Sequence, residues 1–122
     1  MENNNFREKF QKRIHTFIIN LVNFLDSLPK NDSLSLVIKN QLIRSGTSVG
    51  ANYVEAGAAS SRKDFINFLH HSLKSANESG FWLTLLSDSK RGDAGKVSIL
   101  LRELDELSKI LGSSIITLKN KK

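Results

Sequence analysis

The sequence predicts an all-α protein, an up-down-up-down antiparallel four-helix bundle formed by a single domain over residues 1–122. Apolar residues recur at intervals of three and four along four blocks, at about residues 6–28, 34–56, 65–86 and 97–118. This spacing places them on one face of a helix. Short polar segments separate the blocks, and the whole chain contains a single proline. Four amphipathic helices with short connections pack as an up-down-up-down bundle.

Turn and capping residues mark where the helices begin and end. Pro29 follows the first block and cannot continue a helix, so the first helix ends before it. Asp32 or Ser33 can then cap the second helix through a side-chain oxygen. After a break rich in glycine and alanine, Ser60 or Ser61 can cap the third helix in the same way. The ends of the chain, at 1–5 and 119–122, are expected to be flexible.

The second helix has an unusual run of small residues at 45–52, where glycines and β-branched residues lower helix propensity. We expect tertiary packing to hold this helix, because small side chains allow a neighbouring helix to approach closely. Gln41, Ser45 and Asn52 fall on or near its apolar stripe. These polar residues have two interpretations, a network that fixes the packing register or a ligand site.

Two charged residues of the same helix need partners from elsewhere. Arg44 and Glu55 are eleven residues apart and share a face at a separation of about 16 Å along the axis, too far to pair. Glu78 on the third helix is a candidate partner for Arg44, since a buried charge needs a partner.

The third helix is apolar on two sides. Phe81 and Leu85 project roughly opposite Phe65 and Leu69, and Trp82 lies well off the core stripe. A bundle helix is normally polar on its outer face, and an exposed aromatic patch often marks a partner surface. This pattern predicts a homo-oligomer. The alternative is that these residues pack beneath the polar turn that follows or the N-terminal arm.

The chain carries 18 Lys and Arg residues against 12 Asp and Glu residues, a formal net charge of +6. A basic surface is typical of nucleic-acid binding, although the same charge also promotes solubility. The candidate contacts to nucleic-acid phosphates are Lys9, Lys12, Arg13, Arg62, Lys63, Lys90 and Arg91. A basic tail follows at Lys119, Lys121 and Lys122.

No pattern in the sequence predicts catalysis, a metal site or a cofactor. Cysteine is absent, and His15, His70 and His71 form neither a His-Glu-x-x-His nor a Glu-x-x-His pattern. The glycines near residue 46 lack the Lys-Ser/Thr of a phosphate-binding loop. The polar N-terminus and the short apolar runs predict a cytoplasmic protein without a signal peptide or membrane span.

Several segments form a recognisable combination. They are Gln-Leu-Ile-Arg-Ser-Gly-Thr-Ser-Val-Gly-Ala-Asn at 41–52, Glu-Ala at 55–56, Ser-Arg-Lys-Asp-Phe at 61–65, Leu-Lys-x-Ala-x-Glu at 73–78 and Trp-Leu-x-Leu-Leu at 82–86. Together they resemble the bacterial four-helix-bundle family of proteins encoded in 23S ribosomal RNA intervening sequences. The similarity covers about residues 6–118. The sequence departs from many members at Gly80, which replaces a bulkier residue.

The resemblance implies a four-helix bundle that assembles as a ring-like homopentamer and has no enzymatic activity or cofactor. A related protein, the accessory variability protein of diversity-generating retroelements, binds nucleic acid and a reverse transcriptase through a basic pentamer surface. We interpret the residues that match the family signature as packing and assembly residues. They are Arg44, Ser45, Gly46, Gly50, Asn52 and Glu55, together with Glu78, Phe81 and Trp82.

These observations lead to two functional hypotheses. The first is a cytoplasmic, oligomeric scaffold that binds RNA or DNA through phosphate contacts, with strong salt dependence and little sequence preference. The second is a protein-interaction adaptor, whose basic charge serves solubility or an acidic protein partner.

Overall fold

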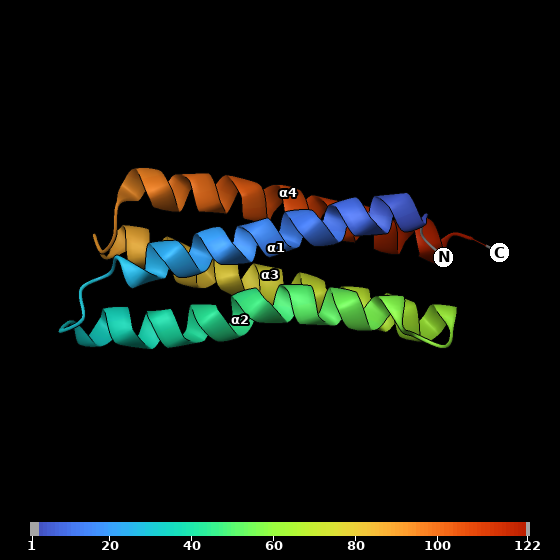
Figure 1. Ribbon diagram of the computed structural model, residues 1–122, viewed down its shortest axis with the longest axis horizontal. Helices are drawn as coiled ribbons and strands as arrows, with labels where there is room; N and C mark the ends of the chain where they lie inside the picture. Colours follow the sequence, from blue (N-terminus) through green and yellow to red (C-terminus); the bar gives the residue numbers. More distant parts are fainter. Residues whose placement is uncertain (1–2, 122) are drawn as a thin grey trace.

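The computed structural model describes residues 3–121, which form four α-helices joined by short turns (Figure 1). The helices are α1 (Asn4–Asp26), α2 (Ser33–Gly57), α3 (Arg62–Asp88) and α4 (Ala94–Lys119), and no strand occurs within this range. Successive helices run in opposite directions along the long axis of the molecule (Figure 1). The predicted all-α, up-down-up-down four-helix bundle is confirmed.

The two ends of the bundle differ in what they contain. The start of α1, the α2–α3 turn and the end of α4 lie together at one end, which we call the termini end (Figure 1). The α1–α2 and α3–α4 turns lie at the other, which we call the far end. The helices extend into both segments expected to be flexible, and residues 1, 2 and 122 of those segments lie outside the described residues.

Each helix begins at a side chain that accepts a hydrogen bond from a free backbone N–H of the first turn. Asn3 caps α1, and Asp93 caps α4 by accepting from Lys96 N at 3.0 Å. Of the alternatives predicted for the next two helices, Asp32 caps α2 and Ser61 caps α3. A cap satisfies a donor that would otherwise lack a partner within the helix.

The core consists of one apolar stripe from every helix. Burial of each large side chain contributes about 1.5–3 kcal/mol relative to leaving it in water. The side chains with almost no exposure are Ile14, Phe17, Leu21, Leu25, Ile38, Leu42, Val49, Leu69, Leu83, Leu86, Leu107 and Leu111.

The small residues of α2 allow close packing on two sides. A Cβ atom added to Gly46 would lie 2.5 Å from Leu21 Cδ2, and one added to Gly50 would lie 3.0 Å from Ile18 Cδ1. Both glycines therefore face α1. Ser45 faces α3 instead, where its Oγ lies 2.8 Å from the Oγ of Ser79. The close approach of a neighbouring helix is as the sequence predicts, and the structure shows that the run at 45–52 allows it on two sides, toward α1 and toward α3.

Candidate nucleic-acid interface and assembly surface

A cleft lined by cationic side chains lies at the termini end, between the start of α3 and the end of α4. Its volume is about 390 Å³, and we call it the α3–α4 cleft. Its lining consists of Arg62, Lys63, Ile66, Asn67, His70, Leu118, Lys119 and Lys121. No acidic side chain is among the described residues that line it, whereas four of the lining side chains are cationic.

The arrangement of this cleft follows from the bundle topology. In an up-down-up-down bundle the third helix begins at the end where the fourth finishes, so residues some sixty positions apart meet. The contact is direct, because Arg62 Nη1 donates a hydrogen bond of 2.8 Å to the backbone carbonyl of Lys121. None of the ion pairs within residues 3–121 includes Lys63, Lys119 or Lys121. These ammonium groups are available to an anionic ligand.

Arg13, one of the predicted phosphate contacts, takes part in a contact between α1 and α4. Its Nε and Nη2 atoms donate to the carboxylate of Glu103 at 2.8 and 2.7 Å, and Nη2 lies 3.2 Å from Glu106 Oε2. The hydrogen bonds to Glu103 raise the pKa of the Arg13 guanidinium above its usual value. The paired geometry joins two helices and leaves little of this charge for a phosphate.

Arg91, a second predicted contact, clamps the far end. Its Nε donates to Asp32 Oδ2 at 2.6 Å and its Nη2 to Asp32 Oδ1 at 3.1 Å. The same carboxylate accepts from the backbone N–H and the hydroxyl of Ser35 at 2.9 and 2.6 Å. The hydrogen bonds from Arg91, and then those from Ser35, hold the pKa of Asp32 well below its usual value. One carboxylate thus caps α2 and holds the α3–α4 turn against it.

The remaining predicted contacts do not form one surface. Lys9 and Lys12 are exposed on α1, and Arg62 and Lys63 are exposed at the termini end. Lys90 is exposed in the α3–α4 turn, at the far end, where its backbone φ is +59°. The structure therefore brings together Arg62 and Lys63, and it adds to them His70 and the two lysines at the end of α4.

The clamp between Asp32 and Arg91 predicts how stability depends on pH. The ionised form of Asp32 is favoured by folding, so it adds stability above the unfolded-state pKa of about 3.9, and this contribution is lost as pH falls toward the lower folded-state value. We expect Asp32→Ala to lower the urea midpoint at pH 7 and to make it less dependent on pH between about 5 and 2. Asp88→Ala, which removes an exposed carboxylate outside the clamp, is the control. Parallel pH profiles for wild type and Asp32→Ala would contradict this role.

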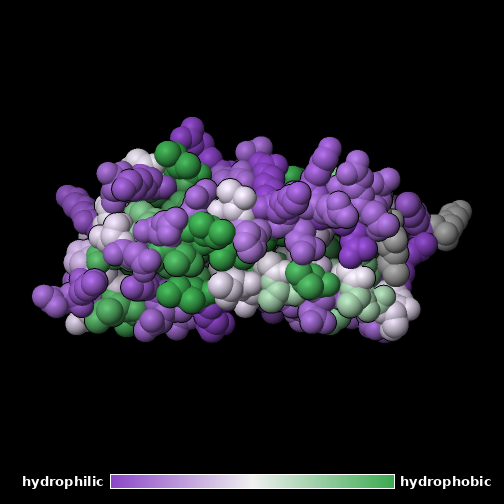
Figure 2. Space-filling view, viewed as in Figure 1, coloured by the Kyte–Doolittle hydropathy of each residue, from purple (hydrophilic) through white to green (hydrophobic). Residues whose placement is uncertain are grey.

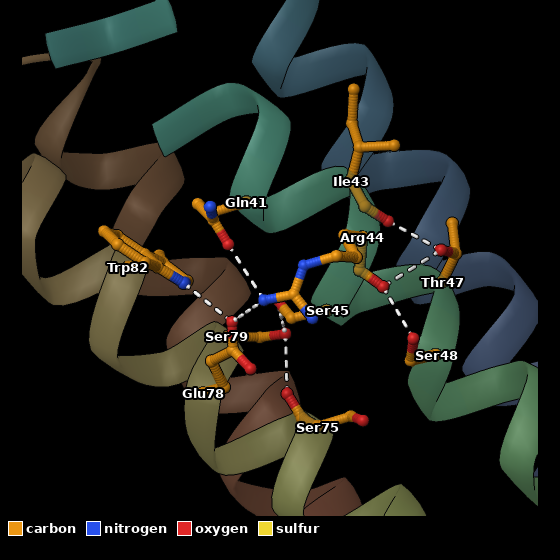
Figure 3. A network of polar contacts seen from close by, with 10 residues as sticks. All are labelled: Gln41, Ile43, Arg44, Ser45, Thr47, Ser48, Ser75, Glu78, Ser79 and Trp82. Carbon is orange, nitrogen blue, oxygen red and sulfur yellow. Dashed lines mark hydrogen bonds and ion pairs between the residues drawn. The ribbon is translucent and has the colours of Figure 1, made fainter. Parts of the chain in front are cut away.

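A polar network lies where α2 meets α3, around Arg44 (Figure 3). Arg44 Nη2 donates to Glu78 Oε2 at 2.5 Å and to Gln41 Oε1 at 2.8 Å. Trp82 Nε1 donates to the same Glu78 oxygen at 3.1 Å. The predicted pairing of Arg44 with Glu78 is confirmed. The expectation that this charge is buried is wrong, because the long Arg44 side chain reaches along the bundle surface and is 61% exposed.

Beneath that network, small hydroxyl-bearing side chains form part of the contact between α2 and α3. The Oγ atoms of the buried residues Ser45 and Ser79 are hydrogen-bonded to each other, and Ser72 Oγ donates to the carbonyl of Val49 at 2.8 Å. Asn52 is only half-buried, and its amide donates to the carbonyl of Ser48 at 2.9 Å. Because these polar groups find hydrogen-bond partners within the protein, the network has the features expected of one that fixes how α2 packs against α3.

The aromatic surface predicted on α3 is exposed in the monomer. Phe81 is 59% exposed, and its ring meets the half-buried Trp82 edge to face, with centroids 4.9 Å apart. Leu85 is half-buried and packs against the core. Phe81 is thus covered neither by the turn that follows α3 nor by the start of α1. We call Phe81 and Trp82, together with the neighbouring aliphatic Leu85, the α3 aromatic patch.

A second apolar surface lies on α1 and α2. Figure 2 shows hydrophobic side chains gathered over the half of this face where α1 ends and α2 begins, whereas the other half is largely hydrophilic. The exposed residues on these helices include Ile19, Leu36 and Ile43. The sequence interpretation missed them. The feature of the sequence that could have indicated this surface is that α2 has more apolar residues than a single core-facing stripe requires.

Within residues 3–121 no three His, Asp or Glu side chains lie close enough to form a metal site. None of the four helices carries an apolar stretch long enough to cross a bilayer.

Comparisons with known proteins agree with the fold and the motifs. The family model described as 23S rRNA-intervening sequence protein matches residues 8–113. A crystal structure of a protein of unknown function from the S23 ribosomal protein family of Bacteroides thetaiotaomicron VPI-5482 is 35% identical, with a TM-score of 0.82. That match covers 89% of this chain and 96% of the other. No curated protein matches the chain. Because the family model spans most of the sequence, the chain belongs to the 23S rRNA-intervening sequence protein family.

Proposed function

We propose that this chain is a non-enzymatic, oligomeric bundle protein of the cytoplasm that binds the phosphate backbone of RNA or DNA. The observation that carries the proposal is the α3–α4 cleft, where Arg62, Lys63, Lys119 and Lys121 converge with His70 and no acidic side chain is among the described lining residues. Cations that form no ion pair within the protein gain most from binding phosphate, because contact releases condensed counterions.

The chemistry of the cleft fits backbone contact better than sequence recognition. Lysine ammonium groups contact phosphates as point charges, and the guanidinium of Arg62 retains donors beyond the one given to Lys121. Such contacts position a nucleic acid without reading its bases. An oligomer would repeat the cleft around the assembly and raise affinity through simultaneous contacts.

Charge reversal in the cleft tests the proposal. We expect Arg62→Glu with Lys63→Glu to weaken binding to a labelled RNA roughly 10- to 100-fold at about 50 mM salt, and to reduce the slope of log K against log salt by about two. Fluorescence anisotropy over a series of salt concentrations measures both quantities. Wild type is expected to bind more weakly as salt increases.

The matched control reverses two lysines at the opposite side of the molecule. Lys90→Glu with Lys96→Glu changes the net charge equally, and both side chains are exposed near the α3–α4 turn. We expect it to change affinity far less. Equal weakening by the two double variants would mean that net charge, and not the cleft, governs binding. Absence of binding by wild type at low salt would favour the adaptor.

We also propose that the chain forms a homo-oligomer, with the pentamer that the family resemblance implies as the expected size. The exposed α3 aromatic patch supports this proposal, because aromatic side chains surrounded by polar ones are typical of interface centres. The same exposed surface is the observation that favours the second candidate function, an adaptor that binds another protein.

A further inference from the structure

A second cleft adjoins the first at the termini end, between the start of α1 and the end of α4. Its volume is about 570 Å³, and we call it the α1–α4 cleft. Its lining consists of Asn3, Phe6, Lys109, Ile110, Ser113, Ser114, Thr117, Leu118 and Lys121. Leu118 and Lys121 line both clefts, so the two meet across the end of α4. The described lining of the second cleft is also free of acidic side chains.

Phe6 gives this cleft an aromatic platform. The ring is 41% exposed, although it belongs to a helix whose other phenylalanines are buried. Its orientation is held from beneath by Phe10, which is buried and stacks on it with a centroid distance of 5.9 Å and an interplanar angle of 23°. A ring supported on one face and accessible to solvent has the geometry on which a nucleobase can stack.

Cations continue from this platform to the first cleft. Lys121 lies at the junction, and Lys119, Arg62 and Lys63 follow toward α3. Lys109 also lines the α1–α4 cleft. Its Nζ atom lies 3.0 Å from Asp105 Oδ2, and both side chains of this ion pair are exposed. An aromatic ring beside a groove of cations is the combination by which proteins hold single strands, since bases stack on the ring and phosphates follow the charges.

We propose that the α1–α4 and α3–α4 clefts form one continuous track for single-stranded nucleic acid, with a base stacked on Phe6 and the following phosphates against Lys121, Lys119, Arg62 and Lys63. This inference rests on the proposed function and adds that the ligand is single-stranded. In a duplex the bases are stacked on one another and paired, so their faces cannot reach Phe6. Ile110 and Leu118 give the α1–α4 cleft apolar walls, which suit contact with a base or sugar better than contact with a charged phosphate group.

Truncation of the platform tests the inference. The probes are a fluorescein-labelled single-stranded oligouridylate of about 12 nucleotides and an RNA duplex of equal length, read by anisotropy at about 50 mM salt. We expect Phe6→Ala and Phe6→Leu to weaken single-strand binding about tenfold and to leave duplex binding within about twofold. Phe6→Trp is expected to retain single-strand affinity, because its ring also stacks.

The control is Ile116→Ala, which removes an exposed apolar side chain of α4 that lines neither cleft. Circular dichroism and mass in solution establish that each variant is folded and assembled as wild type; Phe6→Leu keeps an apolar contact with Phe10 if Phe6→Ala does not fold.

Unchanged single-strand affinity in Phe6→Leu, or equal loss for both probes, would overturn this inference. If Arg62→Glu with Lys63→Glu still weakens binding in that case, the proposed function stands. If wild type binds neither the single-stranded probe nor the duplex, both this inference and the proposed function are wrong.

Discussion

Replacing Gly46 with valine is expected to lower the free energy of unfolding by about 3 kcal/mol, at the upper end of the usual cost of overpacking a core. Gly46 is buried against α1, and even a Cβ atom there would lie 2.5 Å from Leu21 Cδ2. Leu21 is itself fully buried, so its side chain has little room to turn away. Valine has a better helix propensity than glycine by several tenths of a kcal/mol, which is too little to offset the clash.

The bundle contains a matched control for this change. Gly112 lies inside α4, and a Cβ atom added to it would meet nothing within 4 Å. Gly112→Val changes the same intrinsic helix preference without the clash, so we expect it to be neutral or slightly stabilising. Urea unfolding at one protein concentration compares the two, since oligomerisation makes stability depend on concentration. Equal destabilisation at both sites would show that helix preference, and not contact with α1, determines the effect.

The sequence predicts the helices well because the signals that form them are local. The apolar spacing, Pro29 and the capping residues Asp32 and Ser61 each act within a few residues, and all appear in the structure as expected. The sequence does not predict which neighbouring helix each side of α2 contacts. Gly46 contacts α1 and Ser45 contacts α3. This arrangement depends on how the four helices are placed around the core, which no local sequence pattern specifies.

The candidate sites show the same division. Arg44 finds Glu78 as predicted, because both positions lie on adjacent helices at matching heights. The sequence predicts Arg13 and Arg91 as phosphate contacts and gives no sign of their ion pairs, because the partners Glu103 and Asp32 are distant in sequence and close only in the folded chain. The meeting of Arg62 with Lys121 could have been inferred from the topology alone, because the third helix must begin where the fourth ends.

Removing the α3 aromatic patch is expected to dissociate the proposed homo-oligomer. We predict that Phe81→Ala with Trp82→Ala changes the mass in solution from that of an oligomer to that of a single chain, while far-ultraviolet circular dichroism is largely unchanged. Buried interface aromatics often contribute 2 kcal/mol or more each, so losing both weakens each contact by roughly a thousandfold. Light scattering after size exclusion measures the mass directly. Phe81 lies outside the core. Trp82 packs against the edge of the core and is half-buried, so we expect the fully buried residues of α3 to keep the helix folded without it.

A control of similar exposure separates this patch from apolar surface in general. Ile99 and Ile116 on α4 are 60% and 63% exposed, and changing both to alanine removes comparable apolar groups elsewhere. We expect that variant to keep the mass of wild type. If the aromatic double variant also keeps it, the contact lies elsewhere, and the exposed residues Ile19, Leu36 and Ile43 on α1 and α2 become the next candidates. A monomeric wild type would contradict self-association itself, and the exposed aromatic rings would then fit the adaptor, which needs a different protein to cover them.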